Sequence, residues 1–201
     1  KCAKECIGIQ PEYKHFGTMN IVNSKRGTYY IADTLVNQHP DKETLKDIAR
    51  LTANTIRFFN EEPKIAGISF SSFGVDKTGS PRLMHDVVAE LQAEDPNLKI
   101  DGEMTVDLAL DHKRRDEKYP FLRLHGENVN SMIFTSLSAA NSAYRLIKQF
   151  SPETEVIGPI QMGLNKPIHF TDFDSSVRDI VNITAVAVID AYVNKIKNTR
   201  K

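Results

Sequence analysis

The sequence predicts an α/β protein in which helices cover both faces of a sheet. Five short apolar runs alternate with segments whose apolar residues recur at helical spacing, and polar or glycine-containing loops join them. The runs are rich in isoleucine, valine and phenylalanine and show no polar alternation, as expected of strands buried on both faces. Strands that alternate with helices in this way are typical of an α/β sheet. The runs lie at 28–32, 64–70, 98–100, 131–134 and 156–160.

Four helices are predicted from their start signals and apolar stripes. Small hydroxyl or acidic side chains cap the first backbone N–H groups of a helix, proline fits its first turn, and acidic residues there complement its dipole. A serine followed three residues later by an acid forms a capping box. The starts and stripes are Pro40-Asp41 with 45–59, Ser80-Pro81 with 83–91, Thr135-Ser136 with 137–150, and the capping box Ser176-Val177-Arg178-Asp179 with a helix to about residue 196.

The predicted final helix is apolar nearly all the way round from Ile180 to Val193. A helix of this composition has to be buried on most sides, which requires more partner surface than one sheet layer supplies. The stretch contains Asn182, Thr184 and Asp190 and is shorter than the roughly 20 apolar residues of a membrane span. We therefore expect a buried helix, no membrane partner, and some partner surface outside these residues.

The composition excludes several classes of function. The 201 residues hold 26 lysines and arginines against 26 acids, with a pI near 7.2, so no overall field attracts a polyanion. Two acids follow the basic stretch 112–115 at once, which predicts a solvated helix face and no nucleic-acid partner. Cys2 and Cys6 lack enough neighbouring ligands for a metal. Reduced cysteines without a signal-peptide pattern predict a cytoplasmic protein.

Three loops follow predicted strands, where the ligands of open α/β sheets bind. The first, 71–80, joins a strand to a capped helix and contains Ser71, Ser72, Gly74 and Lys77. Backbone N–H groups, hydroxyls, a helix start and a lysine together suit an anion. The loop matches neither of the glycine-rich phosphate-binding motifs, so a plain polar surface loop is the alternative interpretation.

The other two loops carry carboxylates. Asp101 and Glu103, with Asp107 four residues on, have a spacing that fits a metal ion or an acid–base pair, although Glu103 and Asp107 also fit caps of a short helix. The acids of 171–176 fit the dipole of the final helix. No histidine lies in a nucleophile motif with serine or cysteine. The residues alone therefore predict an anion or cofactor cleft and no particular reaction.

Several segments together resemble the phosphate acetyltransferase family. They follow in the family's order from about residue 27 to about residue 191, and five segments in register are far more specific than any one motif. Residues 30–37 are most similar to one sub-branch, the acetyltransferase-like C-terminal domain of the hybrid NADP-dependent malic enzymes of bacteria. The segments are 65–70 with the serine-rich loop, Asp101-Gly102-Glu103 through Leu110, 137–146, Ile157-Gly158-Pro159-Ile160 through Pro167, and 176–182.

The resemblance implies a three-layer α/β/α fold with a mixed sheet, of the isocitrate and isopropylmalate dehydrogenase type. It implies two subdomains with CoA or acetyl-CoA between them, the first subdomain being split and incomplete in this chain. The implied division is a leading segment 1–23, an inserted subdomain 24–155 and a tail 156–201 that completes the first subdomain. It also implies a homo-oligomer, a dimer through the inserted subdomain, with NADP and a divalent metal in an N-terminal malic-enzyme domain elsewhere.

The resemblance and the first loop together give the candidate ligand-binding residues Ser71, Ser72, Gly74, Lys77, Asn165, Lys166, Asp172 and Asp179. Active acetyltransferases carry Ser-Arg-Gly where this sequence has Asp172, Phe173 and Asp174, so an aromatic residue between two anions replaces an essential cation. Two like charges about 4 Å apart repel by about 1 kcal/mol in water and about 4 kcal/mol at an effective dielectric of about 20, which opposes acyl-phosphate binding. Asp179 matches the family's catalytic aspartate, but its place in the capping box explains it as well.

Three functional hypotheses follow from these residues. The first is a regulatory and oligomerisation domain of an NADP-dependent malic enzyme, which responds to acetyl-CoA and has lost transferase activity. The second, which depends on Asp179 and the retained glycine-containing segments, is an active phosphate acyltransferase that moves an acetyl group between CoA and phosphate. The third is a dimerisation domain without a ligand.

Overall fold

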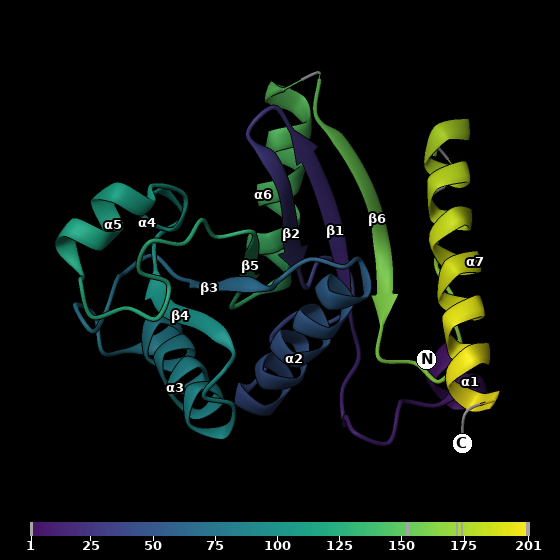
Figure 1. Cartoon of the computed structure of the whole chain (residues 1–201), viewed down its shortest axis with the longest axis horizontal. Coiled ribbons are helices and arrows are strands. Elements are labelled where there is room, and N and C mark those ends of the chain that lie inside the picture. The colour runs from purple at the N-terminus through teal and green to yellow at the C-terminus, as the bar shows by residue number, and fades with distance from the viewer. Residues whose placement is uncertain (1, 152, 172, 174, 200–201) are drawn as a thin grey trace.

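The computed structural model describes residues 2–151, 153–171, 173 and 175–199, with side chains described as far as Val193. It confirms the predicted α/β class, because a six-stranded mixed sheet lies between helices (Figure 1). The strands are β1 (Gly17–Ser24), β2 (Gly27–Ala32), β3 (Lys64–Ile68), β4 (Lys99–Met104), β5 (Ser131–Phe134) and β6 (Glu155–Met162). Their order is β4-β3-β5-β2-β1-β6. β1 runs antiparallel to β2 and β6, and the other pairs are parallel.

All five predicted runs form strands, but β1 is not among them. Thr18, Asn20 and Asn23 interrupt its apolar residues, so the sequence shows no apolar run there. In the structure the first six residues of β1 are buried, including Thr18 and Asn20, which are 1% and 2% exposed. Hydrogen bonds inside the protein allow these polar side chains to occupy buried strand positions.

The helices lie on both faces of the sheet and complete three layers. They are α1 (Cys2–Ile7), α2 (Lys42–Phe58), α3 (Gly79–Glu94), α4 (Val106–Leu110), α5 (His112–Lys118), α6 (Leu137–Phe150) and α7 (Val177–Thr199). One apolar cluster packs α2 and α3 on the sheet and includes Ile183 of α7. A second cluster packs α4 and α6 on the other face.

Three helices begin at their predicted caps, α7 after Ser176 among them, and one does not. The side chains of Asp41 and Ser136 accept the backbone N–H three residues further on, at 2.9 and 3.3 Å, and so cap α2 and α6. The N-cap of α3 is Thr78 instead of the predicted Ser80. The carboxylate of Asp76 accepts the backbone N–H and the hydroxyl of Thr78 and keeps that residue extended, so the helix starts directly after it.

The predicted solvated face of 112–115 is wrong for Arg115, whose side chain is completely buried. Its guanidinium donates to the backbone carbonyl oxygens of Ala109, Leu124 and Glu127 at 3.2, 2.8 and 2.6 Å. A buried cation is tolerated when such hydrogen bonds replace water. Arg115 therefore fixes the loop before β5 against α4.

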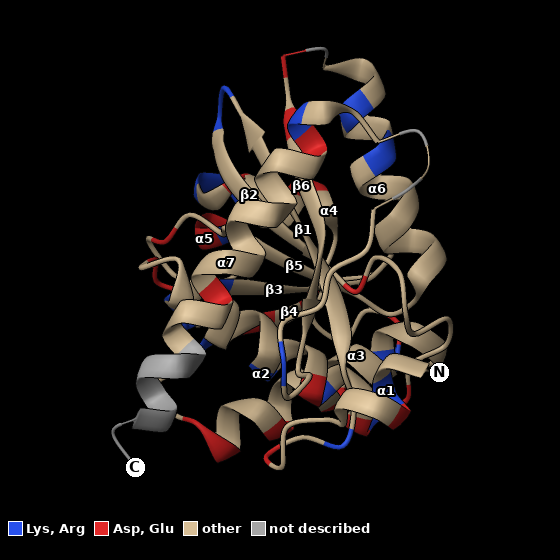
Figure 2. Ribbon diagram, turned by 90° about the vertical axis from the view of Figure 1, so that its right-hand side faces the viewer, with Lys and Arg blue, Asp and Glu red and all other residues tan. Residues whose placement is uncertain are grey.

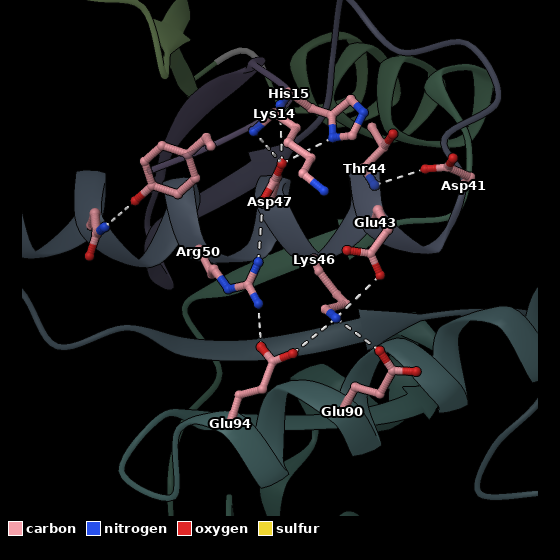
Figure 3. Close-up of polar contacts among 12 residues, drawn as sticks. Lys14, His15, Asp41, Glu43, Thr44, Lys46, Asp47, Arg50, Glu90 and Glu94 are labelled. Atoms are coloured by element: carbon pink, nitrogen blue, oxygen red, sulfur yellow. Dashed lines mark hydrogen bonds and ion pairs between the residues drawn. The ribbon is translucent and has the colours of Figure 1, made fainter. Parts of the chain in front are cut away.

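An ion-pair network joins α2 to α3 (Figure 3). Lys46 lies at its centre with a side chain 8% exposed, and its Nζ lies 3.3 Å from Glu43 and 2.9 Å from both Glu90 and Glu94. Hydrogen bonds to Glu90 and Glu94 raise the pKa of Lys46. Asp47, one residue on, accepts two backbone N–H groups of the segment that precedes β1. The network thus fixes two helices and the approach to the sheet.

The final helix, α7, lies beside the edge strand β6 (Figure 1) and has no charged residue from Ile180 to Ile189 (Figure 2). Ile183 is buried, but Val181 is 60% exposed and Val188 is 62% exposed. The described elements therefore cover one side of α7, and its expected burial on most sides, with partner surface outside these residues, stays a prediction. Of the helices described, none has the length and apolar character needed to cross a membrane.

The predicted division at residues 24 and 155 falls at two neighbouring strands. β1 ends at Ser24 and β6 begins at Glu155, and both strands belong to the same sheet as the rest of 24–155. The division into subdomains stays a prediction, and so does the isocitrate dehydrogenase type of the fold.

Glu127 neutralises two lysines that face each other across the sheet. Lys64 and Lys99 begin β3 and β4 and are direct cross-strand partners, an arrangement that is destabilising for like charges. The carboxylate of Glu127 lies 2.6 Å from the Nζ of Lys64 and 2.5 Å from that of Lys99. Hydrogen bonds to Lys64 and Lys99 lower the pKa of Glu127 from 4.5 to about 2.

We predict that Glu127→Gln lowers the free energy of unfolding at neutral pH by about 1–2 kcal/mol. A carboxyl whose pKa is lower in the folded state stabilises the protein above its ordinary pKa, and this contribution is lost as the pH falls from 4.5 towards about 2. Urea unfolding of both proteins from neutral pH downwards measures the difference, which should shrink below pH 4.5. Glu62→Gln is the control, because Glu62 is 58% exposed and should matter less. A difference independent of pH would contradict the prediction.

Candidate functional site

A cavity of about 460 Å³ lies between β6, α6 and the start of α7, and β1 contributes to its wall. Its volume is that of an ordinary small-molecule site. The lining combines cations, amides and hydroxyls with backbone of β6. The lining residues are Asn20, Tyr144, Arg145, Lys148, Gln149, Val156, Gly158, Pro159, Thr171, Ser175 and Asp179.

Asp179 lies in the first turn of α7 and forms the predicted capping box with Ser176. Its Oδ2 accepts the backbone N–H of Ser176 at 3.0 Å and the Ser176 hydroxyl at 2.8 Å, while the Ser176 hydroxyl accepts the Asp179 N–H at 3.1 Å. The hydrogen bonds from Ser176 lower the pKa of Asp179, so the carboxylate is ionised at neutral pH. The predicted structural role of Asp179 is therefore confirmed, and the residue also faces the cavity.

Arg145 and Lys148 bring positive charge to the cavity from one side of α6. Residues three apart on a helix are neighbours on its surface. The Nε of Arg145 donates to Oδ1 of Asn141 at 2.8 Å, one turn earlier, and its guanidinium carbon lies 5.5 Å from the ring centroid of Tyr144. The start of the 23-residue helix α7 adds the positive end of a helix dipole. This combination suits an anionic ligand.

β6 is irregular where it passes Asn20. Its pairing with β1 shifts register between Met19 and Ile21, and Gly158 there has a φ of 136°. A Cβ on Gly158 would lie 2.9 Å from both the Nδ2 of Asn20 and the carbonyl oxygen of Met19. No side chain fits at that position, so the backbone of β6 itself forms part of the cavity wall.

The serine-rich loop is separate from this cavity. It follows β3, and neither Ser71, Ser72, Gly74 nor Lys77 is a lining residue. The N–H of Gly74 donates to the buried carboxylate of Glu103 at 2.6 Å, and the hydroxyls of Ser71 and Ser72 accept backbone N–H groups at 3.0 and 3.2 Å. Much of the hydrogen-bonding capacity that would bind an anion is therefore used inside the protein.

Lys166 lines a second cavity, of about 630 Å³, between β6, α2 and α7, and Asn165, the residue before it, is not a lining residue. The Nδ2 of Asn165 donates to the carbonyl oxygen of Ile7 and joins this loop to α1. His169 lines the same cavity, its Nδ1 accepts the backbone N–H of Gln161 at 3.0 Å, and burial lowers its pKa. The predicted residues are thus distributed over three places.

The carboxylates of the second loop do not converge on one point. Glu103 is completely buried, and its Oε2 lies 3.2 Å from the Nδ1 of His85. Asp107 pairs with Arg114 at 2.9 Å on the surface. Throughout the described part of the chain, no three histidine, cysteine, aspartate or glutamate side chains gather as a metal site requires.

Sequence reasoning missed most of the residues that line the first cavity. Asp172 and Asp174 lie outside the described residues, so of the described candidates Asp179 alone lines it. Arg145 belongs to the segment 137–146 that resembles the family, so a signal for it existed. Asn20 gives no signal in the sequence, because a strand with scattered asparagines matches no motif.

Fold and cavity together define an α/β domain with a cationic cavity at the edge of a mixed sheet. The chain belongs to the phosphate acetyl/butaryl transferase family, whose profile matches residues 1–188. It is 38% identical to the NADP-dependent malic enzyme of Salmonella typhimurium over 94% of its length. It is also 36% identical to the phosphate acetyltransferase of Clostridium acetobutylicum over 83% of its length. The predicted resemblance is therefore confirmed.

Solved structures agree with this assignment. The EutD phosphotransacetylase from Staphylococcus aureus has a TM-score of 0.85 and 27% identity, covering 94% of this chain and 58% of its own. A phosphotransacetylase from Streptococcus pyogenes has a TM-score of 0.85 and 28% identity, covering 96% of this chain and 57% of its own. The chain spans 25% of the Salmonella malic enzyme and 50% of the Clostridium acetyltransferase.

We predict that Gly158→Ala destabilises the protein more than Gly27→Ala. Both glycines have strongly positive φ, 136° and 128°, so alanine is strained at either position. A Cβ at Gly27 meets nothing within 4 Å, whereas at Gly158 it meets backbone and Asn20. The difference in the free energy of unfolding should be about 1–3 kcal/mol by urea denaturation. Equal losses would contradict the close approach of β6 to Asn20.

Proposed function

We propose that this chain is the phosphate-acetyltransferase-like domain of a bacterial, cytoplasmic NADP-dependent malic enzyme, in which it binds acetyl-CoA as a regulatory ligand and supports oligomerisation. The assignment to a malic enzyme is supported by the malic enzyme among the relatives, which matches 94% of this chain. The observation that carries ligand binding is the cavity in which Arg145 and Lys148 face the start of α7. NADP and a divalent metal would bind in another part of the full protein.

The donor set of the cavity fits a CoA ester. Such a ligand carries phosphates and a thioester carbonyl, for which cations, a helix start and neutral amides are suitable partners. Arg145 and Lys148 would bind phosphate oxygens, and Asn20 and Gln149 supply uncharged groups. When bound, the ester supplies a charged group that contacts α6 and α7 at once.

The loss of transferase activity is supported by the loop before α7. Family members that act on acyl phosphate have Ser-Arg-Gly at the positions of Asp172, Phe173 and Asp174, so this chain lacks the arginine. The side chain of Phe173 is fully exposed. The Asp179 carboxylate is ionised and accepts a hydrogen bond from Ser176. Helix capping therefore accounts for this residue without a catalytic role.

A regulatory role needs a ligand that binds two conformations with different affinity. The cavity is suited to this because it lies between α6 of the proposed inserted subdomain and α7 of the proposed tail. Among described residues, α7 is fixed mainly by β6 and keeps an exposed apolar side. This exposed apolar side supports a split first subdomain, in which residues elsewhere in a longer chain would cover α7.

We predict that the intact protein binds acetyl-CoA by calorimetric titration, saturating below about 1 mM, and makes no acetyl-CoA from CoA and acetyl phosphate. Lys148→Ala should weaken binding about tenfold, because it removes one charge-assisted contact worth about 1.4 kcal/mol. Lys113→Ala, an exposed lysine of α5 outside the cavity, is the matched control.

Other outcomes would select the alternative functions. Turnover in the transferase assay that disappears in Asp179→Ala would show an active phosphate acyltransferase. Absence of binding at millimolar acetyl-CoA, with an intact oligomer, would show a dimerisation domain without this ligand. Binding that is equally weakened by Lys113→Ala would show a nonspecific charge effect.

We predict that the proposed dimer forms through an exposed aromatic group on the inserted subdomain. The rings of Phe73, Tyr119 and Phe121 lie within 4.4 to 6.0 Å of one another, and Phe121 is 72% exposed. Phe121→Ser should halve the mass measured by light scattering on the isolated chain. Phe150→Ser, 83% exposed on α6, should leave the mass unchanged. A wild-type monomer, or equal effects of both variants, would contradict this interface.

A further inference from the structure

Thr34, in the loop after β2, hydrogen-bonds towards two different walls of the 460 Å³ cavity. It is 1% exposed and lines no part of the cavity itself. Its hydroxyl donates to Oδ1 of Asn20 at 2.6 Å, and its backbone carbonyl accepts the Nδ2 of Asn141 at 3.0 Å. Asn141 in turn holds Arg145. One residue therefore connects a neutral donor on β1 and a cation on α6.

The short contact fixes which way the Asn20 amide faces. The Thr34 hydroxyl donates to the Oδ1 of Asn20 at 2.6 Å, an ordinary O–H···O separation, so the amide oxygen faces Thr34. The amide nitrogen then points away from Thr34, towards Gly158 and the cavity. Asn20 is 2% exposed, and within the described chain its Nδ2 has no acceptor. This amide lines the cavity, where a ligand oxygen can accept its N–H groups.

The second connection holds the guanidinium of Arg145. Asn141 donates through Nδ2 to the Thr34 carbonyl, and its Oδ1 accepts the Nε of Arg145 at 2.8 Å. A hydrogen bond at Nε leaves the terminal nitrogens of the guanidinium for a ligand. The amide of Asn141 is thus used at both ends, and Arg145 is held although its side chain is exposed.

Buried residues next to Thr34 hold it in place in turn. Its backbone N–H donates to the Thr18 hydroxyl at 3.3 Å, and Thr18 donates to the buried carboxylate of Asp33 at 2.5 Å. The position of the Thr34 hydroxyl is therefore set by two buried residues, Thr18 of β1 and Asp33 of the loop after β2, and not by the surface.

We propose that Thr34 is a positioning residue that aims the Asn20 amide and the Arg145 guanidinium at one phosphate oxyanion in the cavity. The inference rests on the proposed function, because it assigns the residues that recognise the anionic part of that ligand. The shared chemistry is a phosphate group, which either a CoA ester or free inorganic phosphate supplies. Titrations with acetyl-CoA and with inorganic phosphate distinguish the two sources.

The test compares binding of both ligands to the intact wild-type protein, Thr34→Val and Thr34→Ser by calorimetry. Thr34→Val keeps the shape of the side chain and removes the hydroxyl, so affinity should fall about tenfold. Thr34→Ser keeps the hydroxyl and should bind within about twofold of wild type. A merely structural role would lower the thermal midpoint without this rescue pattern in affinity.

A second pair of variants keeps the proposal testable if Thr34→Val does not fold. Asn141→Ala, at a half-buried position, releases the exposed Arg145 side chain and should weaken binding about fivefold, whereas Ser142→Ala, exposed on the same helix, should have no effect. Thr34→Val and Asn141→Ala proteins that bind like wild type would overturn this inference alone. A wild-type protein that binds neither ligand would overturn the proposed function together with it.

Discussion

The carboxylate of Asp33 is the contact on which the arrangement of this protein depends. It is 3% exposed and accepts six hydrogen bonds, from the backbone and hydroxyl of Thr18 on β1, the backbone N–H groups of 35–37 and the side chain of Asn37. A buried carboxylate is stable only when such donors replace water. Because these donors come from two segments, the same group fixes the loop after β2 and the polar strand β1. That strand is the joint between β6 and the rest of the sheet.

Local signals explain how much of the fold was predictable. Apolar runs located five strands, because central strands are apolar whatever their partners are, and the caps at Asp41 and Ser136 act on their own helices. Such local signals predicted neither the strand β1 nor the burial of Arg115. Each is polar or charged and becomes a buried element only through partners far away in the sequence, such as Asp33 for Thr18 and the carbonyl oxygen of Leu124 for Arg115. Tertiary hydrogen bonds of this kind leave no periodic pattern.

The candidate site was less predictable for a related reason. Family motifs contain residues that support the fold as well as residues that face ligands, and the sequence does not separate them. Gly74 donates inward to Glu103, and Asn165 binds the backbone of Ile7, although both belong to segments that resemble the family. Asp179 is both a helix cap and a cavity residue. Spacing along the chain also does not report that β1, α6 and α7 meet, since only the sheet order brings them together.

Separate sets of hydrogen bonds hold the positive and the negative groups of the cavity. The positive side depends on Arg145, which is fixed through Asn141 to the buried Asp33 loop. The negative group, Asp179, depends on the capping box of α7. Under the proposed function, a ligand anion that pairs with Arg145 lies in a cavity that Asp179 also lines, so binding would act on the start of α7 as well as on α6. Because few described contacts fix α7 beyond β6, that helix is the element whose position such a charge would change most.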